Sequence, residues 1–171
     1  SFLAEHLTNP ELSTQRCPLS ARVILDEVVA RSGIFLPAHA FTPHKGVYGC
    51  CTHRLTALLG EQGFSRIFAL ELGLSADTGL ADHLSEVAEL TFLSNSDAHS
   101  LKNIGREYNL FLLAEPSFAE LVMALQKKEE RKVLANFGLD PRLGKYHRTQ
   151  CLSCGKIAEA PPPVVSCPDC G

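Results

Sequence analysis

Asp97 and His99 are separated by one residue in the segment SNSDAHSL (94–101), which directly follows the apolar residues 91–93. In an extended chain, residues two apart point to the same side, so a carboxylate oxygen and an imidazole nitrogen could bind one metal ion. The same segment also suits a polar turn, because Asp, Asn and Ser are common in turns. The pair by itself therefore leaves a metal site and a turn both open.

Four cysteines at the carboxyl end give a stronger signal. They form the pattern C-x2-C-x12-C-x2-C, with glycine directly after each pair: Cys151, Cys154, Gly155, Cys167, Cys170 and Gly171. Four thiolates at ~2.3 Å satisfy a tetrahedral Zn²⁺ completely, and glycine tolerates the positive φ of a tight knuckle. The alternatives are two disulfides or a redox pair, but a reducing compartment and the duplication of the motif favour a structural zinc ribbon.

Apolar runs predict the elements that position these residues. Residues 18–33 show helical spacing and end at a glycine, and short apolar runs at 34–39, 66–72 and 91–95 predict buried strands. His39, Glu71 and the Asp97–His99 pair each come at the carboxyl end of one of these strands. In a parallel sheet those ends share one face, so we expect these side chains to converge there, with Glu71 as a ligand or as a supporting residue. A lone histidine such as His39 is otherwise more often a hydrogen-bonded structural residue.

Helix and strand signals alternate along the rest of the chain. A helix is expected over 53–63, a second after the potential cap Asp77, a strand over 110–114, and a helix after the capping box of Ser117 and Glu120. The basic and acidic run at 127–132 is expected to be a solvated helix end. This order predicts an α/β fold, with a parallel sheet or a (β/α) barrel.

Composition sets outer limits on function. The chain has 171 residues, 45% of them hydrophobic, with a net charge of −3 and a pI of about 6.1, which fits a folded domain with a small appendage and excludes a global basic field. No apolar stretch reaches the ~20 residues of a membrane span, and we expect a cytoplasmic protein. Its seven cysteines are an odd number, and we expect them to be reduced. Cys17, Cys50 and Cys51 are assigned no chemistry.

A local cationic segment precedes the cysteine motif. Residues 136–150 include Arg142, Lys145, His147 and Arg148 around Tyr146, with little compensating acid. Such a segment could bind phosphates and stack a base on the tyrosine, or it could be a solvated linker.

Five segments resemble one known family: FLPAHAFTPHKGVYG, ELGLSADTGLADHL, FLSNSDAHSLKNIGREYN, NFGLDPRLGKYHRTQC and the paired C-x-x-C motif. They resemble the endonuclease Q family of DNA-repair nucleases, within the polymerase-and-histidinol-phosphatase (PHP) superfamily. The resemblance spans about residues 14–171. It implies a distorted (β/α) barrel of the PHP type with a cluster of divalent ions (Zn²⁺, Mg²⁺ or Mn²⁺), which cleaves DNA on the 5′ side of uracil, hypoxanthine, xanthine or an abasic site.

The family motifs map onto individual residues here. His39 resembles the single-histidine motif, and Asp97 with His99 resembles the final D-x-H motif of the metal cluster, with Asp97 as the catalytic residue. The loop of His44, Lys45 and Tyr48 is a candidate to line the base pocket or the DNA channel. Arg106, Lys145, His147 and Arg148 are candidate phosphate contacts.

The family's amino-terminal H-x-H motif has no counterpart, since His6 has no histidine two residues on. We therefore expect residues 1–140 to be the carboxyl-terminal half of a PHP-like barrel, whose amino-terminal half is missing, and 141–171 to be a basic linker and four-cysteine zinc ribbon. Such a fragment is expected to be inactive by itself.

Two other functions remain open. A PHP phosphoesterase acting on a small phosphorylated metabolite would share the metal ligands but would not need the ribbon or the cationic segment. A non-catalytic nucleic-acid-binding module would depend on the ribbon and not on Asp97. A nuclease that contacts several phosphates loses substrate affinity steeply with salt, which distinguishes it from the small-molecule phosphoesterase. Substitution of Asp97 should leave a non-catalytic binding module unaffected, which distinguishes that module from a nuclease.

Overall fold

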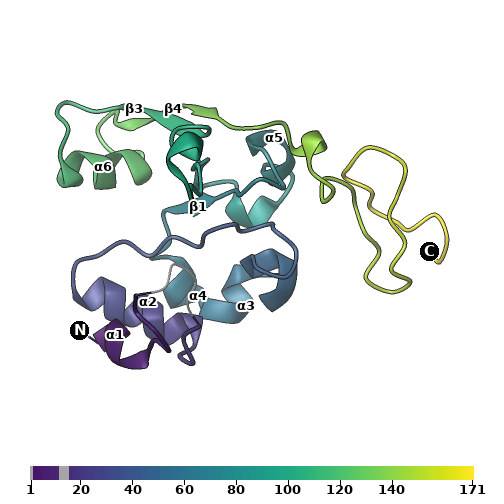
Figure 1. Cartoon of the computed structure of the whole chain (residues 1–171), viewed down its shortest axis with the longest axis horizontal. Helices are drawn as coiled ribbons and strands as arrows, with labels where there is room; N and C mark the ends of the chain where they lie inside the picture. The colour runs from purple at the N-terminus through teal and green to yellow at the C-terminus, as the bar shows by residue number, and fades with distance from the viewer. Residues whose placement is uncertain (1, 12–15) are drawn as a thin grey trace.

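The structure is a computed structural model that describes residues 2–11 and 16–171. It is an α/β fold in which short helices and two small sheets alternate along the chain (Figure 1). The helices are α1 (Phe2–His6), α2 (Ala21–Ala30), α3 (Leu55–Leu59), α4 (Glu61–Phe64), α5 (Thr78–Ala81) and α6 (Phe118–Leu125). The strands are β1 (Ala69–Glu71), β2 (Thr91–Leu93), β3 (Tyr108–Leu112) and β4 (Lys132–Phe137).

The centre of the fold is a parallel pair, β1 and β2, in which Glu71 is opposite Leu93. Every residue of both strands is buried, as expected for strands covered on two faces. The end of the 34–39 segment lies beside β1, because the Glu71 N–H donates to the Pro37 carbonyl at 3.1 Å and the Ala40 N–H donates to the Glu71 carbonyl at 2.9 Å. The strand expected over 34–39 is nevertheless not formed. Proline has no N–H to donate, and His39 adopts a positive φ of 50°, so a regular ladder cannot continue there.

A strand does form near residues 110–114, but its expected parallel pairing is wrong. β3 pairs instead with β4 as an antiparallel hairpin, with a register shift between Leu110 and Phe111. Strand β4 was not expected, because the charged residues at its start and just before it were assigned to a helix end. The chain actually leaves α6 through a turn with positive φ at Lys127, Glu129 and Glu130, and Arg131 folds back to bind Glu120 at 2.9 Å.

Two expected helices are shorter than the sequence suggested. The helix over 53–63 breaks into α3 and α4 at Gly60, whose φ is 70°. The helix after Asp77 ends at Ala81, and a 3-10 turn, η2 (Ser85–Val87), follows. Two expected caps are present: Asp77 Oδ1 accepts from the Leu80 N–H at 2.8 Å, and Ser117 Oγ accepts from the Glu120 N–H at 3.3 Å.

The hydrophobic core lies on both sides of β1 and β2. On one side α2, α3 and α4 pack beneath the strands, and on the other side α6 and the β3–β4 hairpin form a second layer (Figure 1). The larger cluster centres on Leu25, Leu55, Leu59, Leu70 and Leu72, all essentially inaccessible to solvent. Each such side chain stabilises the fold by about 1.5–3 kcal/mol, so the strand ends have a rigid base.

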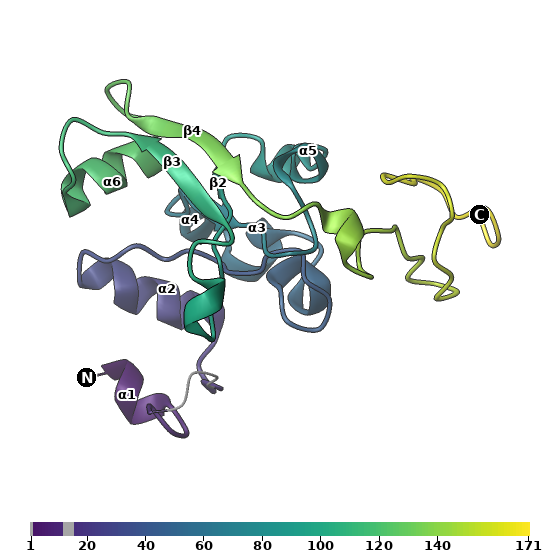
Figure 2. The ribbon, with the colours of Figure 1, turned by 45° about the horizontal axis from the view of Figure 1, so that its top comes forward.

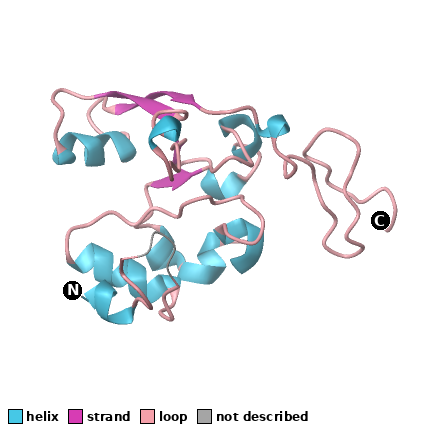
Figure 3. Ribbon diagram, viewed as in Figure 1, coloured by secondary structure: helices cyan, strands magenta, loops and turns pink. Residues whose placement is uncertain are grey.

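Residues 141–171 form a tail that extends from the end of the hairpin (Figure 2). After a short 3-10 turn, η4 (Pro141–Leu143), the tail is almost entirely loop (Figure 3). Its backbone is ordered by local contacts, such as the isolated bridge between Gln150 and Ile157. In the described part of the chain, every helix is too short or too polar to span a bilayer.

Candidate functional site

His39 is held in place by Glu71, the last residue of β1. The buried Glu71 carboxylate accepts the backbone N–H of His39 at 2.6 Å and the N–H of Gly73 at 2.8 Å, and its Oε2 lies 3.1 Å from Nδ1 of the His39 ring. A neutral ring with its proton on Nδ1 presents the lone pair of Nε2 on the opposite side. Glu71 is thus a supporting residue, in the arrangement common behind metal-binding histidines.

Asp97 and His99 lie on the side to which Nε2 of His39 points. Oδ1 of Asp97 is 3.9 Å from that nitrogen and 3.3 Å from Nε2 of His99. The chain at Asp97 is not extended as we expected, because its φ is 43°. The structure nevertheless places the two histidines on the same carboxylate oxygen, and all three side chains are partly accessible to solvent.

The donor set of this cluster fits a divalent ion, although the cluster is open. Bonds of about 2.0–2.2 Å would place two donors of one ion about 3–3.5 Å apart. The Asp97–His99 pair at 3.3 Å matches this spacing, whereas the Asp97–His39 pair at 3.9 Å is longer and the three ligand atoms do not all lie within 4.8 Å of one another, so His39 and His99 must move together to share one ion. Three protein donors leave further coordination positions for water, substrate or other ligands.

The backbone around His39 is packed closely through glycines. A Cβ at Gly46 would lie 1.9 Å from the His39 carbonyl oxygen, and one at Gly73 would lie 3.1 Å from the His39 Cα. Gly73 also has a φ of 71°, which a side chain would strain. The loop from 39 to 46 is therefore fixed against the end of β1.

Asparagines of the hairpin fix the other strand end, and sequence reasoning missed them. Asn109 bonds both the N–H and the carbonyl of Ser94, at 2.8 and 3.0 Å, just before the Asp97 motif. Asn136 donates to the Phe92 carbonyl and to Asn109, at 2.8 and 2.7 Å. The sequence signal that could have identified them is that both asparagines lie inside strands, where asparagine is normally depleted.

The four cysteines of the tail form a second centre. Their sulfur atoms all lie within 4.8 Å of one another, and the pairs Cys151–Cys170 and Cys154–Cys167 are 3.6 and 3.7 Å apart. Adjacent sulfurs of a tetrahedral zinc site lie about 3.8 Å apart, so the set fits Zn²⁺. Among residues 2–11 and 16–171, it is the one group of three or more potential ligands that meets this mutual distance.

The local backbone suits thiolate ligands. Gly155 and Gly171 have φ of 73° and 89°, and their N–H groups donate to the carbonyls of Cys151 and Cys167 at 2.9 and 3.0 Å. Backbone N–H groups of Cys154 and Ser153 lower the pKa of the Cys151 thiol to about 6. Both glycines thus form the expected tight turns, and the backbone N–H groups stabilise negative charge on the Cys151 sulfur.

The vicinal pair Cys50–Cys51 lies on the π-helical turn η1 (Val47–Cys51). The two sulfur atoms are 3.5 Å apart and exposed. The hydrogen bond to Cys50 raises the pKa of the Cys51 thiol. In the described residues, neither thiol belongs to a group of three or more potential metal ligands within 4.8 Å of one another.

The candidate surface residues separate into two groups. His44 and Lys45 are exposed, and the His44 ring meets Tyr146 edge-on at 6.4 Å, beside Lys145, whose ammonium lies 4.9 Å from the same ring. Tyr48 instead faces inward: its ring stacks on Phe41 and its hydroxyl donates to Glu86 at 2.8 Å. Burial of Tyr48 raises its pKa, and its contact with Glu86 makes it a structural residue.

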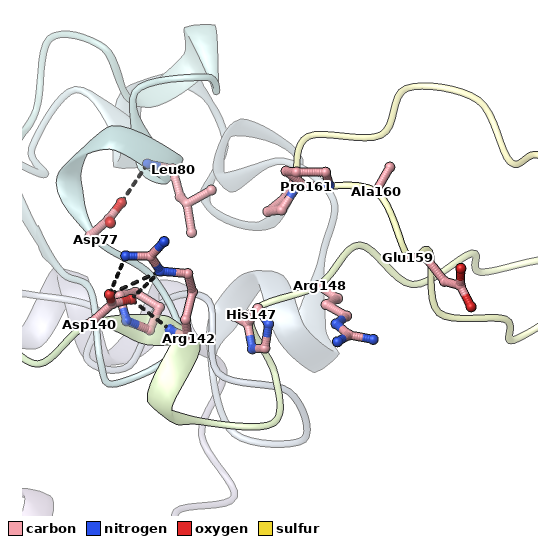
Figure 4. A pocket seen from close by; sticks show the side chains of 11 residues that line it. Asp77, Leu80, Asp140, Arg142, His147, Arg148, Glu159, Ala160 and Pro161 are labelled. Carbon is pink, nitrogen blue, oxygen red and sulfur yellow. Dashed lines mark hydrogen bonds and ion pairs between the residues drawn. The ribbon is translucent and has the colours of Figure 1, made fainter.

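A pocket lies between the α/β part and the tail (Figure 4). It has a volume of about 420 Å³ and is bordered by Arg142, His147 and Arg148 on one side and by residues 159–162 on another. Arg142 is paired with Asp140 at 2.6 Å, which lowers the pKa of that carboxyl to about 2. Arg106 lies elsewhere and donates through Nε to the Ser96 carbonyl at 2.8 Å.

Comparison with known proteins gives one family model and several relatives. Residues 78–129 match the PHP-associated family model. "Uncharacterized protein YqxK" of Bacillus subtilis is 43% identical over 172 aligned residues, which cover 100% of this chain and 43% of that protein. "Uncharacterized protein MJ0043" of Methanocaldococcus jannaschii is 44% identical over 112 residues, covering 60% of this chain and 14% of that protein.

Two solved structures are similar over most of the chain. The lesion-specific endonuclease Q from Pyrococcus furiosus has a TM-score of 0.78 and 36% identity over 92% of this chain and 39% of that one. Endonuclease Q in complex with a 27-mer duplex substrate, with an abasic lesion at its active site, has a TM-score of 0.77 and 35% identity over 92% and 40% of the two chains. This chain thus spans about two fifths of their length. It contains a PHP-associated domain, is similar to endonuclease Q over most of its length, and corresponds to a carboxyl-terminal portion of those longer proteins.

Proposed function

We propose that this chain is part of a metal-dependent DNA-repair endonuclease, which cleaves the phosphodiester on the 5′ side of a deaminated base (uracil, hypoxanthine or xanthine) or of an abasic site. The observation that supports it most is the approach of His39 and His99 to one oxygen of Asp97, at 3.9 and 3.3 Å. The similar structure with an abasic duplex at its active site supports DNA as the substrate.

In this proposal His39, Asp97 and His99 hold the catalytic ions, and Glu71 orients the His39 ring. Divalent ions bound there would lower the pKa of a water molecule and stabilise charge on the phosphate. Asp97 accepts a hydrogen bond from the attacking water and orients it in line with the bond to be broken. The partial exposure of all three side chains leaves room for a phosphodiester beside them.

Two surfaces carry basic side chains that suit a polyanion. The rings of His44 and Tyr146 and the ammonium of Lys145 lie in contact, with the exposed Lys45 next to His44 in the chain, and His147 and Arg148 border the pocket beside the tail. We assign phosphate contacts to these basic residues and base stacking to Tyr146. A deaminated base pairs poorly, so it leaves the duplex stack at a lower cost than a normal base.

We further propose that the chain needs additional residues to cleave DNA. The solved relatives are more than twice as long, and three protein ligands leave an open cluster. Residues 1–140 then provide one half of a PHP-like barrel and 141–171 a linker and four-cysteine zinc ribbon. The free thiols fit a reducing compartment such as the cytoplasm.

The test is an incision assay on duplexes with one uracil, one hypoxanthine or one abasic site, with this chain and with a form extended at its amino end. We expect the extended form to nick 5′ of the lesion, and its Asp97→Asn variant to be inactive but equally stable. A well-folded extended form that cleaves none of these duplexes would overturn the proposal. Loss of substrate affinity with rising salt separates a nuclease from a phosphoesterase of small metabolites.

A further inference from the structure

A short apolar ridge lies directly after the candidate metal site. The 3-10 turn η3 (Leu101–Asn103) begins two residues after His99. Leu101 is 88% exposed and Ile104 is 67% exposed. Single exposed leucines are ordinary, but in a 3-10 turn the side chains at i and i+3 eclipse one another, so this pair presents one common apolar face.

The ridge is fixed relative to Asp97 and His99. The turn is closed by backbone bonds from Asn103 to Ser100 and from Ile104 to Leu101, at 3.0 and 3.2 Å. The bond from Arg106 Nε to the Ser96 carbonyl, at 2.8 Å, joins the two ends of the loop that contains the metal ligands and the ridge. Gly105, with φ of 73°, allows the sharp exit from the turn. One hydrogen-bonded loop thus holds both the ligands and the apolar pair.

The chemistry around the ridge favours duplex DNA as its occupant. Lys102 is exposed within the turn, between the two apolar residues in sequence, and Arg106 follows two residues after Ile104, so the apolar pair has cations close to it in the same loop. Leu and Ile are residue types that proteins insert between base steps, while flanking cations neutralise phosphates. In the similar endonuclease Q complex, an abasic lesion lies at the active site. Such a lesion leaves a gap in the stack that an apolar side chain can fill.

We propose that Leu101 and Ile104 form a wedge that enters the base stack beside the lesion. The wedge holds the duplex open while Asp97 and His99 face the adjacent phosphodiester. This inference rests on the proposed function and deepens it, because it names the group that makes a duplex lesion accessible.

The test compares duplex and single-stranded substrates that contain the same abasic site. Leu101→Ser/Ile104→Ser is made in the form of the protein that incises DNA, and Phe118→Ser serves as the matched control, since Phe118 on α6 is 61% exposed. We expect the double variant to lose about tenfold or more on the duplex and to stay within about twofold on the single strand, because only the duplex must be unstacked. 2-Aminopurine placed beside the lesion should brighten on binding of the wild type and not of the double variant.

Three results would overturn the wedge while the proposed function stands: equal losses on both substrates, no loss on either, or a lowered melting temperature of the double variant. The last result would show that Leu101 and Ile104 pack against another part of the protein. If the wild type incises neither substrate, the proposed function itself fails and the wedge fails with it. The control variant should match the wild type on both substrates.

Discussion

Oε2 of Glu71 lies 3.1 Å from Nδ1 of His39 and also accepts the His39 backbone N–H at 2.6 Å. One buried carboxylate oxygen therefore fixes the position of the histidine and the direction of its ring. The consequence is that Nε2 points toward Asp97, which it approaches at 3.9 Å. A supporting carboxylate of this kind holds the tautomer and orientation of a ligating histidine ring.

Glu71→Gln should weaken metal binding at the cluster about ten- to a hundredfold, the usual effect of losing such a carboxylate. Isothermal titration with Mn²⁺, after the cysteines have been saturated with zinc, measures the affinity. Glu107→Gln is the control, because Glu107 is also buried and burial raises its pKa, but its carboxylate accepts the Leu139 N–H and not His39. Equal affinity in the Glu71 variant and the wild type would contradict the assigned role.

Cys154→Ser should remove one zinc equivalent per chain and disorder the tail, because ~20 residues with little core depend on the metal for their folding. Metal analysis and proton NMR of the tail amides measure both effects. Unfolding of the α/β part should be unchanged, since its core is formed by other residues. Cys50→Ser, in the vicinal pair outside this group, should retain the zinc.

Glu86 gives the fold an acid-sensitive component. Burial of Glu86 opposes its ionisation, but hydrogen bonds from Thr56 and Leu55 outweigh it and lower the pKa from 4.5 to about 2. The depressed pKa adds stability that is complete above about pH 4.5 and is lost as the pH falls toward 2. The contribution is about 3 kcal/mol, measurable as the change in unfolding free energy across this window.

Glu86→Gln should flatten the pH dependence in that window, whereas Glu89→Gln, an exposed neighbour, should leave it unchanged. An equally steep acid loss in the Glu86 variant would show that another carboxylate is responsible. Because Glu86 accepts from the first two N–H groups of α3, the variant should also fray that helix.

Gly46→Ala should destabilise the loop behind His39, because its Cβ would lie 1.9 Å from the His39 carbonyl oxygen. Crowding of this kind costs about 1–3 kcal/mol or more, and the displaced loop should also weaken metal binding. Gly60→Ala, at the break between α3 and α4, is a useful contrast: it strains a φ of 70°, at about 1–2 kcal/mol, and its Cβ would meet nothing closer than the Arg22 guanidinium at 3.5 Å. Equal metal affinities for the two variants would contradict the close packing behind His39.

The features that could be predicted from the sequence were those that depend on residues close together in the chain. The cysteine spacing and the glycines after it predicted the knuckle turns, and apolar runs located β1 and β2. The pairing of β3 with β4 could not be read in this way, because the choice between a parallel and an antiparallel partner depends on contacts far apart in the chain. The break at Gly60 and the left-handed backbone at His39 and Asp97 are likewise set by tertiary packing that overrides local preference.

The roles of the supporting residues around the site were the hardest to predict from the sequence. Asn109 and Asn136 act through backbone groups of Ser94 and Phe92, and no periodicity marks such partners. Tyr48 looked like a surface residue of a glycine-rich loop, but the glycines allow the loop to pack closely and turn the tyrosine inward.

The most direct measurement is anomalous diffraction from crystals of this chain grown with Mn²⁺, with data collected on both sides of the manganese absorption edge. We expect a manganese peak bonded to Nε2 of His39, Oδ1 of Asp97 and Nε2 of His99, and no such peak in Asp97→Ala. Anomalous signal confined to the four cysteines, with His39 and His99 bonded to protein atoms alone, would contradict the metal cluster on which the proposed nuclease depends.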